Sequence, residues 1–154
     1  MSTPRVSVVL PVRDEERYLP EALASLAAQT EPDFEVLAVD DGSTDGTPRI
    51  LADWAARDRR FRVVHRPPLG LVAALGRGLA EARAPYVARM DADDLCRPER
   101  LRAQADFLDA HSEVGLVACR ASYLGDPQAN RGLALWVDWA NGFVEPDDIA
   151  RERF

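Results

Sequence analysis

Short apolar runs alternate with amphipathic stretches along most of the chain. Five runs are dominated by β-branched and other apolar residues, a pattern typical of strands that are buried on both faces. We predict strands over residues 6–10, 34–39, 61–65, 86–90 and 114–119. Most of these runs are separated by segments long enough for a helix. The order of elements therefore predicts βαβ units and a mainly parallel α/β sheet.

The amphipathic segments between the strands predict helices. Pro20 and Pro48 each open such a segment, because proline is favoured in the first turn, where its missing N–H costs no hydrogen bond. Thr47 precedes Pro48 and is predicted to cap its helix. Further helices are predicted over residues 71–82, 98–110, 133–143 and 146–153.

Composition narrows the class of protein. The chain has 154 residues, 47% of them hydrophobic, which is enough for one domain with a real core. Its net charge of −7 argues against nucleic acid as a partner. All 19 basic residues are Arg, so no mechanism that needs a catalytic lysine applies. Two cysteines without metal-type spacing, no signal peptide and no membrane-spanning run predict a cytoplasmic protein with reduced thiols.

Three carboxylates, Asp91, Asp93 and Asp94, directly follow the predicted strand over residues 86–90. Two like charges about 4 Å apart repel by roughly 4 kcal/mol at an effective dielectric of about 20. A divalent cation with oxygen ligands would offset this repulsion, and such ions often bind together with substrate phosphates. Asp91 and Asp93 alternate along an extended segment and so project to one side. The alternative is a solvated acidic turn, and Asp94 fits a helix cap.

Polar segments follow three of the predicted strands, at residues 11–15, 40–43 and 91–94. Ligands of open parallel sheets bind at the carboxyl ends of the strands, so these segments predict one shared site. A carboxylate at Asp41 could accept a hydrogen bond from a nucleobase N–H. Asp40 is predicted to hold neighbouring backbone N–H groups, although ordinary turn chemistry also favours Asp and Gly here.

Five motifs, in this order and spacing, resemble the family 2 glycosyltransferases, which have the GT-A fold and a D-x-D motif. The resemblance extends from about residue 5 to 119. It rests on residues 7–12 (SVVLPV), 14–16 (DEE), 26–30 (LAAQT), 39–47 (VDDGSTDGT) and 90–94 (MDADD). It implies a Rossmann-like sheet with helices on both faces, in an inverting enzyme that uses a nucleotide-diphosphate sugar with Mn²⁺ or Mg²⁺.

By resemblance, six residues bind the nucleotide sugar: Pro11, Val12, Glu15, Asp41, Asp91 and Asp93. Asp41 would recognise the base, with uracil favoured and hence a UDP-sugar, Asp91 would contact the ribose, and Asp93 would bind the metal. The acceptor is expected to be a saccharide or a lipid. Peripheral association with the inner face of the membrane and a homodimer are further expectations.

The sequence departs from the family pattern at two points. Gly76 stands where the family commonly has Asn. The family's general base lies downstream of D-x-D, and Asp147–Asp148 fits a helix start better than that role. We therefore expect residues 1–119 to form the nucleotide-sugar core, and 120–154 a partial helical extension, with the sheet truncated and the acceptor half missing.

Other classes of protein compete with this interpretation. A phosphoacceptor receiver domain and a haloacid-dehalogenase-type phosphatase both need a lysine that the chain lacks. A non-catalytic nucleotide-binding or assembly module stays open, because Trp136, Trp139 and Phe143 could form an interface patch rather than cover the sheet.

Overall fold

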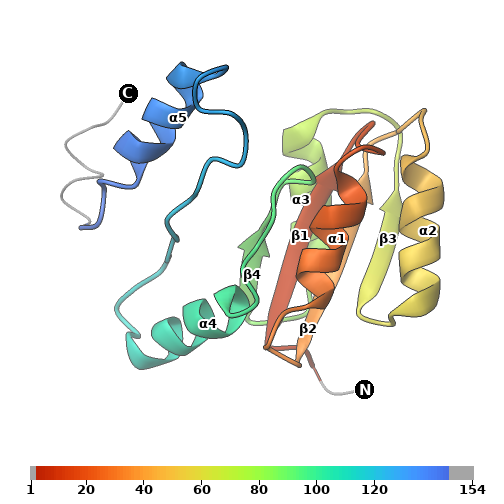
Figure 1. The fold of residues 1–154 in the computed structure, drawn as a ribbon. Helices are drawn as coiled ribbons and strands as arrows, with labels where there is room; N and C mark the ends of the chain where they lie inside the picture. The colour runs from red at the N-terminus through yellow and green to blue at the C-terminus, as the bar shows by residue number, and fades with distance from the viewer. Residues whose placement is uncertain (1–2, 146–154) are drawn as a thin grey trace. The chain divides into compact units, whose positions relative to one another are not determined.

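The computed structural model describes residues 3–145, and their central feature is a four-stranded parallel sheet with the order β3-β2-β1-β4 (Figure 1). The strands are β1 (Val6–Val12), β2 (Phe34–Asp40), β3 (Phe61–His65) and β4 (Tyr86–Arg89). The described helices are α1 (Leu19–Ala27), α2 (Thr47–Arg57), α3 (Leu71–Glu81), α4 (Arg100–Ala110) and α5 (Arg131–Ala140). The predicted α/β class with a parallel sheet is confirmed.

The two central strands, β1 and β2, are buried at every position. They pair in parallel from Val6 opposite Phe34 to Val12 opposite Asp40, so both reach the same edge of the sheet. On the other side of β1, Val9 lies opposite Arg89 at the end of β4. The carboxyl ends of β1, β2 and β4 therefore lie at the same edge of the sheet. β1 and β4 are neighbours at the point where the strand order reverses direction.

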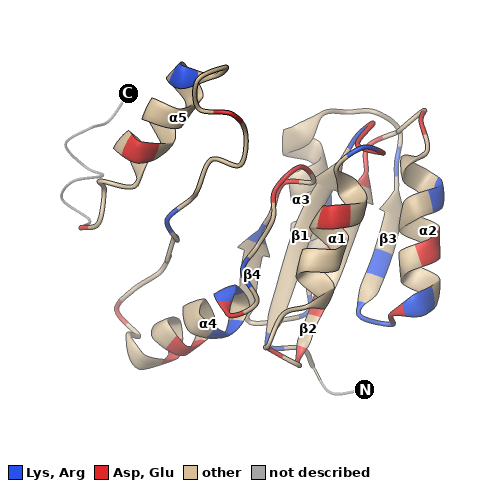
Figure 2. Ribbon diagram, viewed as in Figure 1, with Lys and Arg blue, Asp and Glu red and all other residues tan. Residues whose placement is uncertain are grey.

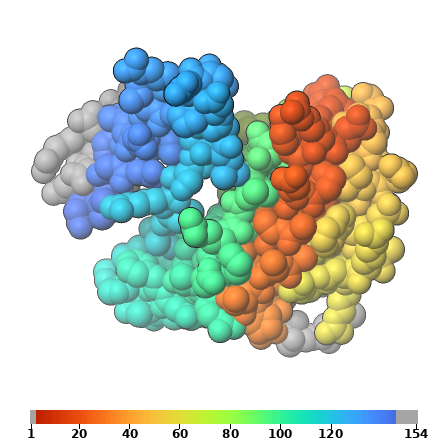
Figure 3. Space-filling view, viewed as in Figure 1, coloured from red at the N-terminus to blue at the C-terminus, as the bar shows by residue number. Residues whose placement is uncertain are grey.

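Helices cover both faces of the sheet, as the sequence predicts. One face packs Val8 and Leu10 of β1 against Leu23 of α1, Leu51 of α2 and Leu101 of α4 in a single buried cluster. In Figure 3 the atoms of α1 and α2 close over this face. Helix α3 lies behind the sheet in Figure 1 and packs on β1 and β2.

The contact between α3 and β1 depends on a glycine. A Cβ atom at Gly78 would lie 2.3 Å from Cγ1 of Val9. Overpacking of this kind typically costs about 1–3 kcal/mol. We expect Gly78→Ala to lower the free energy of unfolding by about that amount, measured by urea denaturation.

Gly76 supplies the matched control on the same helix. Apart from its chain neighbours and the backbone of α3 itself, a Cβ atom there would meet no atom of the described residues within 4 Å. Gly76→Ala should therefore raise the free energy of unfolding by about 0.5–1 kcal/mol, since alanine favours the helix. Equal effects of the two substitutions would contradict close packing at Gly78.

Two local predictions are wrong. Residues 114–119 form no strand. A strand needs a pairing partner, the described strands pair only with one another, and Gly115 weakens the run. Thr47 does not cap α2: Gly46 is the N-cap, and Thr47 is a buried residue of the first turn. Helices α4 and α5 begin two residues from the predicted starts, at Arg100 and Arg131.

The chain divides into two compact units, Met1–Leu116 and Val117–Phe154. Within the second unit, the Asn141 side chain exchanges hydrogen bonds of 2.8 and 2.7 Å with the backbone N–H and carbonyl of Ala121. None of the described helices has the length and apolarity that crossing a membrane requires. The predicted helix over 146–153, and with it Asp147–Asp148, lies outside the described residues.

Candidate functional site

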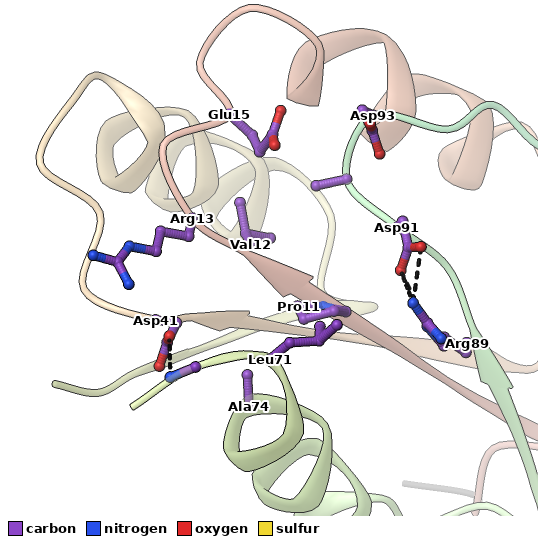
Figure 4. A pocket seen from close by; sticks show the side chains of 12 residues that line it. Pro11, Val12, Arg13, Glu15, Asp41, Leu71, Ala74, Arg89, Asp91 and Asp93 are labelled. Carbon is purple, nitrogen blue, oxygen red and sulfur yellow. Dashed lines mark hydrogen bonds and ion pairs between the residues drawn. The ribbon is translucent and has the colours of Figure 1, made fainter. Parts of the chain in front are cut away.

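A pocket of about 310 Å³ opens at the carboxyl ends of β1, β2 and β4 (Figure 4). All six residues that the sequence singles out line it, together with six others. The full lining comprises Pro11, Val12, Arg13, Glu15, Asp41, Gly70, Leu71, Ala74, Arg89, Asp91, Ala92 and Asp93. The structure thus brings the predicted residues together, while their individual roles stay predictions.

The loop after β1 is fixed by the loop after β2. Asp14 adopts a left-handed conformation (φ 53°), which Asp tolerates better than most residues. Its backbone N–H donates to the Ser43 hydroxyl at 3.0 Å, and its carboxylate accepts from the Thr44 N–H at 2.7 Å. The Glu15 N–H donates to the Thr47 hydroxyl at 2.9 Å. These bonds hold Glu15 at the pocket and explain why Thr47 is buried.

Asp41 organises the loop between β3 and α3. Its two carboxylate oxygens accept hydrogen bonds from the backbone N–H groups of Leu69 (3.0 Å) and Gly70 (2.8 Å). The Arg66 guanidinium lies 3.5 Å away. These bonds, that of Leu69 foremost, lower the pKa of Asp41. Gly70 has φ 90° and ψ 169°, a conformation that essentially only glycine adopts.

Asp40 has the structural role that the sequence predicts. It is buried, and its carboxylate accepts the Ser43 N–H at 3.0 Å and contacts Nδ1 of His65 at 2.9 Å. The adjacent Asp41 lines the pocket. Neighbouring aspartates at the end of β2 therefore serve different purposes, because successive residues of a strand project to opposite sides.

Acidic residues gather in the loops after β1 and β4, as the red segments of Figure 2 show. Burial, and after it the negative charge of Asp93, raises the pKa of both Glu15 and Asp94. Asp91 is different, because the Arg89 side chain donates to both of its oxygens at 2.9–3.1 Å (Figure 4). At this side of the pocket, Asp91 therefore has a cationic partner, whereas the charges of Glu15 and Asp93 repel each other.

The donor set suits a hard divalent cation. Carboxylate oxygens are the ligands that Mg²⁺ and Mn²⁺ prefer, and Asp93 presents them at the pocket. Within residues 3–145, however, no three acidic, His or Cys side chains lie close enough together to hold a metal ion. A metal ion at this pocket would therefore need ligands in addition to the described side chains.

Sequence reasoning missed several pocket residues. Leu71 and Ala74 reach the pocket because α3 begins directly at its wall, and no local motif signals this. Arg89 could have been suspected, since it is a charged residue in an apolar strand two positions before Asp91. Arg13 lies within the polar segment after β1 and lines the pocket beside Val12.

The sequence matches a family model described as Glycosyl transferase family 2 over residues 7–146. It is 36% identical to EpsH of Bacillus subtilis (strain 168) over 119 residues, covering 77% of this chain and 34% of EpsH. It is 38% identical to EpsE of the same organism over 118 residues, covering 75% of this chain and 42% of EpsE. The names of both relatives call them glycosyltransferases.

Solved structures also resemble the fold, and two of them are complexes with a nucleotide sugar. Mannosyltransferase PcManGT from Pyrobaculum calidifontis, in complex with GDP-Man and Mn²⁺, has a TM-score of 0.69 and 31% identity, over 86% of this chain and 39% of that one. S. aureus TarS 1-349 in complex with UDP-GlcNAc has a TM-score of 0.66 and 29% identity, over 79% and 38%. The chain spans about two fifths or less of these proteins' lengths.

Proposed function

The chain belongs to glycosyltransferase family 2, and from that membership we propose that its pocket binds a nucleoside-diphosphate sugar together with Mn²⁺ or Mg²⁺. The observation that carries the proposal is the meeting of Asp41, Asp91 and Asp93 at one pocket, from two different strand ends. The structural relatives PcManGT and TarS, which bind GDP-Man and UDP-GlcNAc, support the ligand class.

Each wall of the pocket suits a different part of such a ligand. Pro11 and Val12 offer an apolar surface from the end of β1. Asp41 is an ionised acceptor and suits the ring N–H of uracil. Each of its oxygens accepts one backbone N–H and keeps a further lone pair. We propose a uridine nucleotide, with Asp91 against the ribose.

Asp93 is the proposed metal ligand. Its carboxylate lines the pocket on the side of the loop after β4. A bound divalent cation would neutralise charge on the departing diphosphate. Glu15, whose carboxyl has a raised pKa, lies in the loop facing Asp93. It is proposed to line the nucleotide pocket rather than to hold the metal.

The proposed reaction is inverting transfer of the sugar to a saccharide or lipid acceptor at the cytoplasmic side of the membrane. Such a reaction needs a general base for the acceptor hydroxyl. Among the described residues, the carboxylates at the pocket are already assigned to donor binding. We therefore propose that this pocket binds the sugar donor, and we assign none of its residues as the general base.

Calorimetric titration with UDP tests the proposal. We expect the chain to bind UDP more tightly with Mn²⁺ than without it. We expect Mn²⁺ to raise the affinity for UDP roughly tenfold or more. Asp93→Asn should remove this gain in affinity, because a neutral amide is a poor ligand for a hard cation.

Asp53→Asn is the matched control, because Asp53 is an exposed carboxylate on α2 that does not line the pocket. It should leave the gain from Mn²⁺ unchanged. The proposal fails if the chain binds neither UDP nor GDP in the presence of Mn²⁺. The proposed role of Asp93 as metal ligand fails if Asp93→Asn, like Asp53→Asn, keeps the gain in UDP affinity from Mn²⁺.

A further inference from the structure

Arg89 and Asp91 form a bidentate pair at the rim of the pocket. Nε and Nη2 of Arg89 donate to Asp91 at 2.9–3.1 Å, and both residues line the pocket. Bidentate guanidinium–carboxylate pairs are among the most specific polar contacts in proteins. The pair therefore orients the Asp91 carboxylate toward Arg89 and offsets its negative charge.

The backbone that carries Arg89 is itself held in place. Nη2 of Arg100 donates to the Arg89 carbonyl at 2.9 Å, and the N–H of Met90 donates to the Val9 carbonyl at 3.2 Å. The strand ladder thus continues past the end of β4. Arg89 therefore projects from a backbone whose carbonyl and following N–H are both hydrogen-bonded.

The two aspartates of the D-x-D motif are in different electrostatic states. Asp91 has a cationic partner, whereas the Asp93 side chain makes no hydrogen bond or ion pair with any described residue. Glu15 and Asp94 add negative charge around Asp93. Within residues 3–145, no three acidic, His or Cys side chains are grouped closely enough to hold a metal ion, so Asp93 would need ligands from elsewhere.

We propose that Arg89 is a positioning residue that pairs with Asp91 and so makes metal binding depend on a bound nucleoside diphosphate. This inference rests on the proposed function. The positive charge of Arg89 offsets that of Asp91, so that Asp91 neither attracts a free cation nor repels the diphosphate, and Asp91 keeps lone pairs for the ribose. Asp93 would hold the metal, and the bound nucleotide would supply the further oxygen ligands that the described residues lack.

The test compares two ligands of opposite charge. Mn²⁺ alone is titrated by electron paramagnetic resonance, and UDP alone by calorimetry in EDTA. In Arg89→Ala, Mn²⁺ should bind about fivefold tighter or more, and UDP about fivefold weaker. Changes of opposite sign are expected because loss of Arg89 leaves the negative charge of Asp91 unpaired, and this charge attracts the metal and repels the nucleotide.

Arg77→Ala is the matched control. Arg77 is as exposed as Arg89 (54% and 55% of the side chain) and also pairs with a carboxylate, Glu81, but lies outside the pocket. It should leave both affinities unchanged. Arg89→Gln, which keeps polar donors without the charge, should behave like Arg89→Ala, and Arg89→Lys should restore most of the wild-type affinity for UDP.

A fall of both affinities in Arg89→Ala would indicate a structural role and overturn the inference, as would no change in either. The Mn²⁺ titration needs no nucleotide. If the wild-type chain binds no UDP or GDP, the proposed function fails, whereas the role of Arg89 toward the metal is still decided by whether Arg89→Ala gains affinity for Mn²⁺.

Discussion

Replacing Asp41 with alanine is expected to abolish nucleotide binding and to lower the free energy of unfolding by about 1–3 kcal/mol. The substitution leaves the N–H groups of Leu69 and Gly70 without their acceptor. It also removes the carboxylate beside Arg66, whose Nη1 is already buried without a partner among the described residues. Two partly buried amides and a guanidinium then lose the same acceptor, and each such loss lowers stability.

Urea denaturation and titration with UDP and Mn²⁺ measure the two effects separately. Asp41→Asn is the informative comparison, because it keeps the size and one oxygen but loses the charge. It should lose less stability than Asp41→Ala, and its affinity for UDP should still fall, since an amide is a weaker acceptor than a carboxylate. Full UDP affinity in a folded Asp41→Asn variant would contradict base recognition by Asp41.

The strands could be predicted because parallel strands that are buried on both faces leave near-continuous apolar runs in the sequence. β1, β2 and β3 each begin where the sequence predicts, at Val6, Phe34 and Phe61. The location of the pocket could be predicted in the same way. Asp41 directly follows β2, and Asp91 lies two residues after the end of β4. Parallel topology alone then brings them to one edge.

The bonds inside the site could not be predicted in the same way. The contact of Asp14 with Thr44 joins residues 30 positions apart, and that of Asp41 with Gly70 joins residues 29 apart. No periodic pattern encodes such pairs, because they depend on how two loops meet after the sheet has formed. The strand over 114–119 failed for a related reason: an apolar run predicts the tendency to form a strand, but pairing requires a neighbour.

Glu35 is the clearest case of a buried group that the sequence pattern conceals. It lies within the apolar run of β2, and only 3% of its side chain is exposed. Its carboxylate accepts hydrogen bonds from the Ser7 hydroxyl at 2.8 Å, from Arg62 at 3.0 Å and from Arg83 at 2.6 Å. A buried carboxylate in a sheet is tolerated because two guanidinium groups and a hydroxyl satisfy it.

These contacts make stability depend on the ionisation of Glu35. Burial by itself would raise the pKa of Glu35, but the hydrogen bonds from Arg83, Ser7 and Arg62 outweigh it and lower the pKa from 4.5 to about 2. As the pH falls, the unfolded chain therefore takes up this proton before the folded chain does. The stabilisation is complete above about pH 5 and is lost between about pH 5 and pH 2.

We expect Glu35→Gln to lower the free energy of unfolding by about 2–3 kcal/mol at pH 7, and the difference from wild type to shrink as the pH falls toward 2. Urea denaturation of both proteins from pH 3 to 7 measures this. Every other carboxylate is common to the two proteins, so their difference isolates Glu35.

Glu81→Gln is the control, because Glu81 contacts the same Arg62 but is 30% exposed. This substitution should lower the free energy of unfolding by less than about 1 kcal/mol. A pH-independent difference for Glu35→Gln would mean that packing, and not the charge, accounts for the loss.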